Sequence, residues 1–385
     1  MRRVAVIGVG QTKHGKRNDV NYPELVYEAV KRALEHADIT IGDVDAIVTG
    51  SMPAPMEGTN DPQLWLTDAL GGYLKPLMRI ATCGSTGISL AHSAYYHVAS
   101  GLFDVVMAAG MEKMYENDPQ GTMTTVAEPF YQRIFTAGAP GIFAQQCNAY
   151  IHRYDIPKEK LREAAAEVSV RNHLDALENP YAHIRVKITV EDVLSSPVIS
   201  YPVRFLDLCP ISDGSCAVIF ASEDFVRKAK IDRVAWVRGL SYAGDEHNFG
   251  DKDLVNWESA IKAARETYRM AGIENPIKEI DVAEIYNPFT YQEILYYELF
   301  GFCKPGEGYK LVLEGAVTKD GEIACDPSGG VLCTNPIGAS GLIRVAEAAL
   351  QIMGEASNQV DSCETALAHA MGGVNQFNGL MILGR

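Results

Sequence analysis

The chain has 385 residues, of which 47% are hydrophobic and 22% are charged, which is enough apolar material for one large or two medium globular domains. Its net charge of -15 comes with no block of Lys and Arg, which argues against nucleic acid and anionic membrane as main partners, because both need a basic face. No run approaches the roughly 18 apolar residues of a membrane span, and the N-terminus lacks a signal-peptide pattern. We therefore expect a cytoplasmic protein.

The first hundred residues alternate short apolar strands with helices. Residues 23–37 place apolar side chains on one stripe after a proline in the first turn, which predicts an amphipathic helix. Residues 84–101 predict a second helix that ends at a glycine. Strands are expected at 4–10, 44–50, 77–82 and 104–110. This alternation is typical of an α/β sheet with helices on both faces.

The segment 116–202 interrupts that alternation, because it is richer in charged and aromatic residues and carries helical patterns such as 158–177. The strand pattern returns at 212–222. We therefore predict three parts: an N-terminal half at 1–115 completed by 203–225, an insertion at 116–202 packed over the sheet, and a C-terminal half at 226–385.

The second half repeats the pattern of the first. Two pairs of segments match in the same order along the chain, each matched helix being followed by an apolar strand. The pairs are 33–50 with 268–287, and 85–101 with 338–354. Two ordered matches favour an internal duplication. The pattern predicts two similar halves related by a pseudo-twofold axis, with ligand chemistry where they meet.

The eight cysteines show no CxxC pair and no Cys/His spacing suited to zinc, so we predict no metal site. They are Cys83, Cys147, Cys209, Cys216, Cys303, Cys325, Cys333 and Cys363. We interpret them as reduced thiols, most of them packing residues.

Cys83 differs from the others because it stands at the start of the helix predicted at 84–101. The positive end of a helix dipole stabilises a thiolate and lowers its pKa. The flanking Gly84, Ser85 and Gly87 allow a tight turn with free N–H groups, which are the parts of an oxyanion hole. Cysteine is also among the most buried residue types, so position alone leaves a nucleophile and a packing residue both open.

His369 is the candidate acid–base residue. It lies at the end of an apolar strand before Gly372 and Gly373, where the backbone can approach a reacting centre closely. A core histidine bonded to a carbonyl group would fit the same pattern. The other histidines lie in helical or charged segments, and we interpret them as surface or packing residues.

These residues, together with four motifs, resemble the thiolase superfamily, in particular the branch related to sterol carrier protein 2 thiolases. The motifs are DVVMAAGMEKM (104–114), AEIYNPFT (283–290), GGVLCTNPIGASG (329–341) and HAMGGVNQFNGLMILGR (369–385). The resemblance implies a five-layered α/β/α/β/α sandwich of two duplicated halves, a loop domain over the active site, and at least a homodimer.

The resemblance also implies roles for single residues. Cys83 matches the nucleophile that takes the acyl group, and His369 matches a histidine near the acid–base and oxyanion region. The remaining implied contacts are backbone donors at Gly84, Gly372 and Gly373, and coenzyme A (CoA) contacts at Gly338 and Ser340.

Two positions depart from the family pattern. Thiolases usually have Gly-His-Pro where this chain has Thr334-Asn335-Pro336, and in the block 286–289 Tyr286 replaces a polar oxyanion-hole residue while Pro288 replaces a possible second cysteine. Asparagine can donate a hydrogen bond to a thioester oxygen, but it cannot transfer protons near pH 7. Asn335 is therefore expected to keep an oxyanion role.

Proton transfer would then move to another residue. The candidates are His369, the phenol of Tyr286 and the thiol of Cys333 if it faces the pocket. His369 ranks first because the ordinary pKa of histidine is nearest to neutral pH.

The expected activity is that of an acyltransferase: CoA-dependent thiolytic cleavage, or the reverse condensation, of a 3-ketoacyl-CoA through an acyl-cysteine intermediate. CoA is a co-substrate, and no permanently bound cofactor is expected. The altered Tyr286 and Asn335 suggest a non-standard substrate such as an aromatic ketoacyl-CoA. The aromatic stretch 287–302 could line a pocket, although core packing fits most of its residues better. Thiolases that work with a small zinc-ribbon/OB-fold partner, such as benzoylsuccinyl-CoA thiolase, are the expected analogues.

Two alternatives remain open. A thiolase-like retro-aldolase would use Tyr286 and dispense with Cys83 as nucleophile. A non-catalytic CoA-binding or scaffold subunit would explain the loss of the Gly-His-Pro histidine.

Overall fold

The central sheet is built from short runs of buried apolar residues. The computed structural model describes residues 2–52, 56, 58–133, 138–246 and 250–385. Within these residues the sheet consists of β1 (Val4–Gln11), β2 (Ala46–Gly50), β3 (Leu77–Arg79), β4 (Val105–Lys113), β7 (Asp213–Ser222), β8 (Ala235–Gly244), β9 (Val282–Glu284), β10 (Ala324–Cys325), β11 (Thr365–Gly372) and β12 (Phe377–Gly384). Every residue of β1, β2, β4 and β11 is buried, as expected of strands covered on both faces.

The order of the strands repeats in the two halves of the sheet. From edge to edge the order is β10-β9-β11-β12-β8-β1-β7-β4-β2-β3. Outward from the central β1–β8 pair, the N-terminal strands β1, β7, β4, β2 and β3 occupy the same places as β8, β12, β11, β9 and β10. The directions agree as well, since β2 runs parallel to β3 and β4, and β9 runs parallel to β10 and β11. The predicted duplication of two halves is therefore confirmed.

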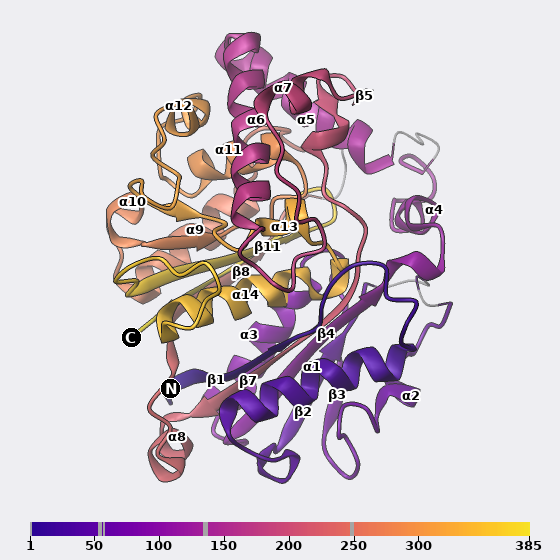
Figure 1. Ribbon diagram of the computed structural model, residues 1–385, viewed down its shortest axis with the longest axis vertical. Helices are drawn as coiled ribbons and strands as arrows, with labels where there is room; N and C mark the ends of the chain where they lie inside the picture. Colours follow the sequence, from indigo (N-terminus) through magenta and orange to yellow (C-terminus); the bar gives the residue numbers. More distant parts are fainter. Residues whose placement is uncertain (1, 53–55, 57, 134–137, 247–249) are drawn as a thin grey trace.

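Four long helices cover the sheet in layers. They are α1 (Tyr22–Ala37), α3 (Thr86–Ala99), α9 (Glu258–Ala271) and α14 (Ile337–Met353). Helix α1 packs on β1 and β7, α9 packs on β8 and β12, and α3 and α14 pack on each other and on both halves of the sheet. Figure 1 shows α3 and α14 between the two groups of strands. The predicted five-layered sandwich is confirmed.

The two central helices approach so closely that glycine is required at their contact. A Cβ on Gly87 of α3 would lie 2.2 Å from the backbone nitrogen of Leu342, and a Cβ on Gly341 of α14 would lie 2.8 Å from that of Ile88. No side chain fits between backbones at these distances. Because both glycines lie near the start of their helices, the N-terminal ends of α3 and α14 meet in the middle of the molecule.

The chain between β4 and β7 forms a separate group of elements. They are α4 (Pro119–Thr124), α5 (Gly138–Tyr154), α6 (Lys158–Asp175), α7 (Val190–Ser195) and the small hairpin of β5 (Val198–Ser200) and β6 (Val203–Arg204). Figure 1 shows this group at the top and right of the molecule. Helix α6 matches the helical pattern expected at 158–177, and the boundaries of the insertion at 116–202 stay a prediction.

The shorter elements connect these layers. They are η1 (Ile41–Asp43), α2 (Gln63–Leu66), η2 (Met114–Glu116), η3 (Phe205–Asp207), α8 (Glu223–Ala229), α10 (Pro276–Glu279), α11 (Thr290–Leu299), α12 (Gly308–Leu313) and α13 (Gly330–Cys333). Strand β3 ends at Arg79 rather than at the expected residue 82, because the chain turns there toward Cys83.

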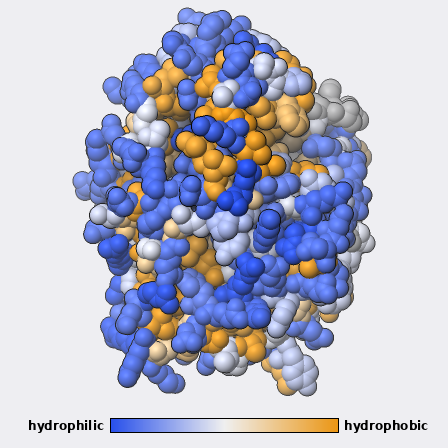
Figure 2. Space-filling view, in the orientation of Figure 1, coloured by the Kyte–Doolittle hydropathy of each residue, from blue (hydrophilic) through white to orange (hydrophobic). Residues whose placement is uncertain are grey.

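Polar side chains cover much of the surface. The face in Figure 2 is mainly hydrophilic, with hydrophobic patches scattered over it and most prominent in its upper half. Among the described helices, none combines the length and hydrophobicity needed to cross a bilayer.

Candidate active site

A cavity of about 830 Å³ lies between the two halves and the elements that connect β4 to β7. Its walls come from segments far apart in the sequence: the turn at Cys83, residues of 114–133 and 138–145, and the loops at 208–211, 286–289 and 371–376. Most of the lining is apolar, including Met52, Met114, Met123, Phe143, Phe289 and Ile337. The cavity therefore suits a bulky apolar group beside a few polar ones.

Cys83 faces this cavity from a strained turn. Its φ is 59°, in the left-handed region that residues other than glycine seldom adopt. The carbonyl group of Cys83 accepts hydrogen bonds from the backbone N–H of Thr86 at 3.0 Å and from its Oγ1 at 2.7 Å. The first turn of α3 therefore holds the cysteine in this conformation.

The backbone N–H groups of Gly84 and Gly373 lie near the thiol of Cys83. Both glycines line the cavity. Burial raises the pKa of the Cys83 thiol, and these two N–H groups oppose the rise. The lowered pKa expected from the helix dipole is therefore not found, because loss of solvent outweighs the favourable donors.

Close backbone packing joins the Cys83 turn to the end of β11. A Cβ on Gly84 would lie 2.7 Å from the carbonyl oxygen of Met371, and a Cβ on Gly372 would lie 2.5 Å from the carbonyl oxygen of Thr82. Gly372 is not among the cavity residues. Its place in the structure favours a packing role over the expected oxyanion role, whereas Gly84 and Gly373 are placed as donors.

Asn335 and Tyr286 both line the cavity and contact each other. The phenol of Tyr286 donates to Oδ1 of Asn335 at 3.4 Å, and the hydroxyl of Ser340 donates to the same oxygen at 2.8 Å. The amide nitrogen Nδ2 of Asn335 donates to Sγ of Cys209 at 3.1 Å. Burial raises the pKa of Tyr286 well above its ordinary value. The structure thus brings Cys83, Tyr286 and Asn335 to one cavity, as expected.

Cys209 is a cavity residue that the sequence did not reveal. No motif surrounds it, and it reaches the cavity through long-range contacts: its backbone N–H donates to the carbonyl oxygen of Pro288 at 2.9 Å, and Leu208 forms a β-bridge with Phe289. Burial raises the pKa of its thiol to about 12, although the hydrogen bond from Asn335 opposes this rise.

His369, which ranked first for proton transfer, lies in the core rather than at the cavity. Its side chain is 0% exposed and packs against the rings of Tyr296 and Phe300. Its Nδ1 accepts from the backbone N–H of Tyr286 at 3.3 Å, and its Nε2 bonds Oδ1 of Asn378 at 3.1 Å. Burial lowers its pKa to about 3. The expected acid–base role does not fit, because both ring nitrogens are engaged and a neutral ring is enclosed.

Three further expectations do not fit the structure. Cys333 is fully buried and does not face the cavity, so it is no candidate for proton transfer. Gly338 and Ser340, expected to contact CoA, are also fully buried. The N–H of Gly338 donates to Oε2 of Glu112 at 2.9 Å, and the hydroxyl of Ser340 is used by Asn335. The carboxylate of Glu112 therefore already accepts a hydrogen bond from the N-terminal end of α14.

The segment that carries Tyr286 is held by buried polar contacts. The N–H of Ile285 donates to Oδ1 of Asp326 at 2.8 Å, and Nδ2 of Asn287 donates to Oε2 of Glu293 at 2.6 Å. The side-chain oxygen of Asn287 in turn accepts from the N–H of Val331 at 2.8 Å. Asn287, which precedes Pro288, thus fixes the loop rather than taking part in chemistry.

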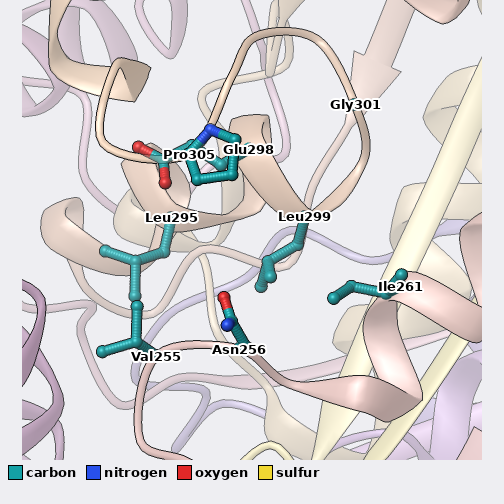
Figure 3. A pocket seen from close by; sticks show the side chains of 8 residues that line it. All are labelled: Val255, Asn256, Ile261, Leu295, Glu298, Leu299, Gly301 and Pro305. Atoms are coloured by element: carbon teal, nitrogen blue, oxygen red, sulfur yellow. The ribbon is translucent and has the colours of Figure 1, made fainter. Parts of the chain in front are cut away.

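The aromatic stretch 287–302 contributes mainly to the core, as expected from the interpretation of its residues as core packing. Tyr291, Tyr296 and Tyr297 of α11 are buried, and only Pro288 and Phe289 line the large cavity. A smaller cavity of about 240 Å³ lies beside Leu295 and Leu299 of α11 (Figure 3).

The smaller cavity offers no nucleophile. Its described lining residues include no cysteine or histidine, and the carboxylate among them, Glu298, accepts hydrogen bonds from the N–H groups of Gly306 and Gly308 at 2.8 Å each. Among the described residues, no three His, Cys, Asp or Glu side chains are grouped to hold a metal ion. The chemistry therefore belongs to the large cavity.

Comparison with known proteins agrees with this geometry. The family model described as thiolase, N-terminal domain, matches residues 4–224, and the model described as thiolase C-terminal domain-like matches residues 243–385. An acetyl-CoA acetyltransferase of Methanothermobacter thermautotrophicus is 34% identical over 100% of both chains. Subunit BbsB of benzoylsuccinyl-CoA thiolase from Thauera aromatica is 31% identical over 97% of this chain and 95% of its own.

The same family includes sterol carrier protein 2 of Gallus gallus, which is 30% identical over 96% of this chain and 70% of its own. Among solved structures, the Ltp2-ChsH2(DUF35) aldolase superposes with a TM-score of 0.83 at 24% identity, covering 99% of this chain and 97% of that one. The chain therefore belongs to the thiolase family, and its assignment to the acyltransferases of that family, with thiolytic CoA chemistry, is confirmed.

Proposed function

We propose that this chain cleaves a 3-ketoacyl-CoA by thiolysis, or forms it in reverse, through an acyl thioester on Cys83. The observation that carries the proposal is the Cys83 thiol itself, which faces the cavity from a left-handed turn with the N–H groups of Gly84 and Gly373 nearby. Strained residues persist where the surrounding structure over-determines them, and such positions cluster at active sites.

The reaction follows from these groups. The thiol of Cys83 releases its proton to solvent and the resulting thiolate attacks C3 of the substrate, while the N–H groups of Gly84 and Gly373 would stabilise the oxyanion that forms. The C2–C3 bond then breaks, and its electron pair passes into the enolate of the departing CoA ester. Asn335 has a second amide hydrogen for the enolate oxygen. After C2 is protonated, the thiolate of a second CoA takes the acyl group, and Cys83 leaves as a thiolate.

The lining supports an aromatic or other bulky acyl group as the substrate. The rings of Phe143 and Phe289 lie with their centroids 4.5 Å apart, and four methionines add adaptable apolar surface. The relative BbsB is named as a subunit of a benzoylsuccinyl-CoA thiolase. A cavity of about 830 Å³ exceeds what an acetyl group alone requires.

The test is to incubate the protein with acetoacetyl-CoA and, separately, with benzoylacetyl-CoA, and to detect the acyl group on the Cys83 peptide by mass spectrometry. We expect a covalent adduct with at least one of these esters, and none in Cys83→Ala. Cys303→Ala serves as the matched control, because Cys303 lies outside the large cavity. Absence of both adduct and cleavage would overturn the proposal.

A second candidate function is a retro-aldolase reaction that uses Tyr286. The observation in its favour is that the phenol lines the cavity next to the Cys83 turn, where a Cβ on Gly84 would lie 3.2 Å from its oxygen. The Cys83→Ala variant separates the two functions. Carbon–carbon cleavage that persists in this variant would favour the aldolase, whereas its loss together with the adduct would favour the thiolase.

A non-catalytic subunit is the remaining alternative. Rapid, selective alkylation of Cys83 by iodoacetamide at neutral pH would argue against it, because an inert packing thiol reacts slowly.

We also propose that the chain assembles as a homodimer with a small zinc-ribbon/OB-fold subunit. The relative BbsB is named as a subunit, and the aldolase structure is named as a complex with a DUF35 protein. Activity measured with and without a co-expressed partner tests this assembly.

A further inference from the structure

The proposed reaction needs a group that protonates C2, and the cavity contains few groups able to do so. Among the described lining residues, the ionisable ones are Cys83, Arg133, Cys209 and Tyr286. Cys83 is the nucleophile. Arg133 does not give up a proton in proteins, and its guanidinium already donates to the carbonyl oxygens of Thr125 and Ala127. The choice is therefore between Cys209 and Tyr286.

Cys209 is held in place by its backbone. Its N–H donates to the carbonyl oxygen of Pro288 at 2.9 Å, and the preceding Leu208 forms a bridge with Phe289. These contacts tie the 208–211 loop to the motif block that also carries Tyr286. The thiol thus enters the cavity beside Pro288, the position where the resemblance placed a possible second cysteine.

The side chain of Asn335 is positioned to stabilise a negative charge on Sγ of Cys209. Oδ1 of Asn335 accepts from the hydroxyls of Ser340 and Tyr286, so Nδ2 is turned toward Sγ of Cys209 at 3.1 Å. A hydrogen bond to sulfur favours the thiolate over the thiol. Asn335 therefore contributes to proton transfer by stabilising the thiolate that remains on Cys209 after the proton has left.

Tyr286 is the weaker candidate. Its hydroxyl donates to Asn335 at the long distance of 3.4 Å, and the negative charges that would form on Cys83 and Cys209 both disfavour a phenolate there. Burial leaves the pKa of Cys209 at about 12, whereas that of Tyr286 lies well above the ordinary value for a phenol. The thiol is thus the easier of the two groups to ionise.

We propose that Cys209 is the second catalytic thiol of this site, acting as general acid toward C2 of the departing CoA ester and as general base toward the incoming CoA. The proton of the Cys209 thiol passes to C2 as the C2–C3 bond breaks, which leaves a thiolate on Cys209. That thiolate takes the proton of the second CoA thiol, and the CoA thiolate attacks the acyl group on Cys83. Cys83 leaves as a thiolate and regains its proton from solvent, so both cysteines return to their starting states. This inference rests on the proposed thiolysis.

Two measurements separate this role from that of Cys83. Alkylation of Cys83 by iodoacetamide needs only the nucleophile, whereas exchange of the methyl hydrogens of acetyl-CoA in D₂O needs the acid–base group. In Cys209→Ala and Cys209→Ser we expect the exchange and the cleavage of acetoacetyl-CoA to fall at least about 100-fold, the usual range for loss of an acid–base group. Alkylation of Cys83 should stay within about threefold of the wild type, because it requires no proton from Cys209.

Matched variants make the outcome decisive. Cys303→Ala should leave both the alkylation and the exchange unchanged. If Tyr286→Phe loses the exchange while Cys209→Ala keeps it, Tyr286 is the acid and the inference is wrong. An equal fall of alkylation and exchange in the Cys209 variants would show a packing effect and would also overturn it. If the wild type forms no acyl-Cys83 at all, the proposed thiolysis fails first, which is a distinct result.

Discussion

Cys83 combines the reactive group and the strained backbone in one residue. A β-carbon in the left-handed region costs free energy that glycine does not incur. Its neighbours impose this conformation, since Thr86 holds its carbonyl group from the first turn of α3. The strain therefore keeps the sulfur turned toward Gly84 and Gly373 at the expense of stability.

A pair of substitutions measures this strain. We expect Cys83→Gly to have a free energy of unfolding about 1 kcal/mol higher than Cys83→Ala, because only alanine keeps a β-carbon at φ 59°. Urea unfolding followed by circular dichroism measures the difference. At a position with negative φ, the alanine variant would be the more stable of the two. A Cys83→Ala variant that is more stable than Cys83→Gly would therefore contradict the presence of strain.

Single residues divide into those that the sequence could predict and those that it could not. Cys83 was predictable because a glycine-rich turn at a helix start has a local signature. His369 was placed wrongly because the end of a strand does not show how deep a side chain lies: Met371 lines the cavity, and His369, two residues earlier on the same face, is enclosed. Cys209 depends on contacts with residues about 80 positions away, which no local pattern reveals.

At the scale of elements, Glu112 joins β4 to the start of α14. Its Oε2 accepts the N–H of Gly338 at 2.9 Å and the N–H of Met52 at 2.9 Å. A carboxylate at a helix N-terminus is favoured by the helix dipole. The motif GMEKM was recognised from the sequence, but its function as the N-terminal anchor of α14 required the structure.

Removal of this anchor should destabilise the protein strongly. We expect Glu112→Ala to lower the free energy of unfolding by roughly 2–4 kcal/mol, because two buried N–H groups lose their acceptor. Glu112→Gln keeps an oxygen at this place and should cost less. Urea unfolding of both variants provides the measurement, and the exposed Glu116→Ala is the control. A loss in Glu112→Ala no larger than in Glu116→Ala would contradict the anchoring role.

At the scale of the whole molecule, the duplication made the layers predictable, because each half repeats the same helix and strand pattern. The cavity was not predictable in the same way. Its wall combines the Cys83 turn with loops at 208–211, 286–289 and 371–376, and these meet only after both halves have folded. A sequence pattern records the periodicity of each element but not the distances between distant loops.

The edge of the sheet carries an apolar surface that fits the expected homodimer. Strand β3 ends the sheet, and an unpaired edge strand favours pairing with another chain. The segment 64–78 also exposes large apolar side chains: Leu64 75%, Trp65 45%, Tyr73 77%, Leu74 87% and Met78 45%. A second copy of this chain would cover both features.

We expect the wild type to elute as a dimer, and the double variant Leu64→Asp/Met78→Lys to be largely monomeric, because charges would be buried at the contact. Size-exclusion chromatography with light scattering measures the mass. Leu102→Asp is the control, because Leu102 is 80% exposed but lies outside this segment. A dimer that survives the double variant would place the interface elsewhere.

The buried acidic groups between the halves make stability depend on pH. Burial and the nearby charge of Glu284 raise the pKa of Glu347 from 4.5 to about 7. A raised carboxyl pKa means that the folded state holds the proton more tightly than the unfolded chain does. Its contribution to stability is therefore complete below about pH 4.5 and is lost as the pH rises through about 7.

Glu347→Gln should remove this loss without removing the contacts. Oε1 of Glu347 accepts from Nε2 of Gln11 at 2.8 Å, and the amide oxygen of glutamine can accept the same bond. We expect the variant to gain stability relative to the wild type between pH 5 and pH 8, by about 1.4 kcal/mol for each pKa unit of the shift. Urea unfolding at both pH values gives the difference, and the exposed Glu35→Gln controls for net charge. Because the buried histidines are the same in both proteins, their titration cancels. Equal pH dependence of the wild type and Glu347→Gln would show that Glu347 is already ionised in the folded state.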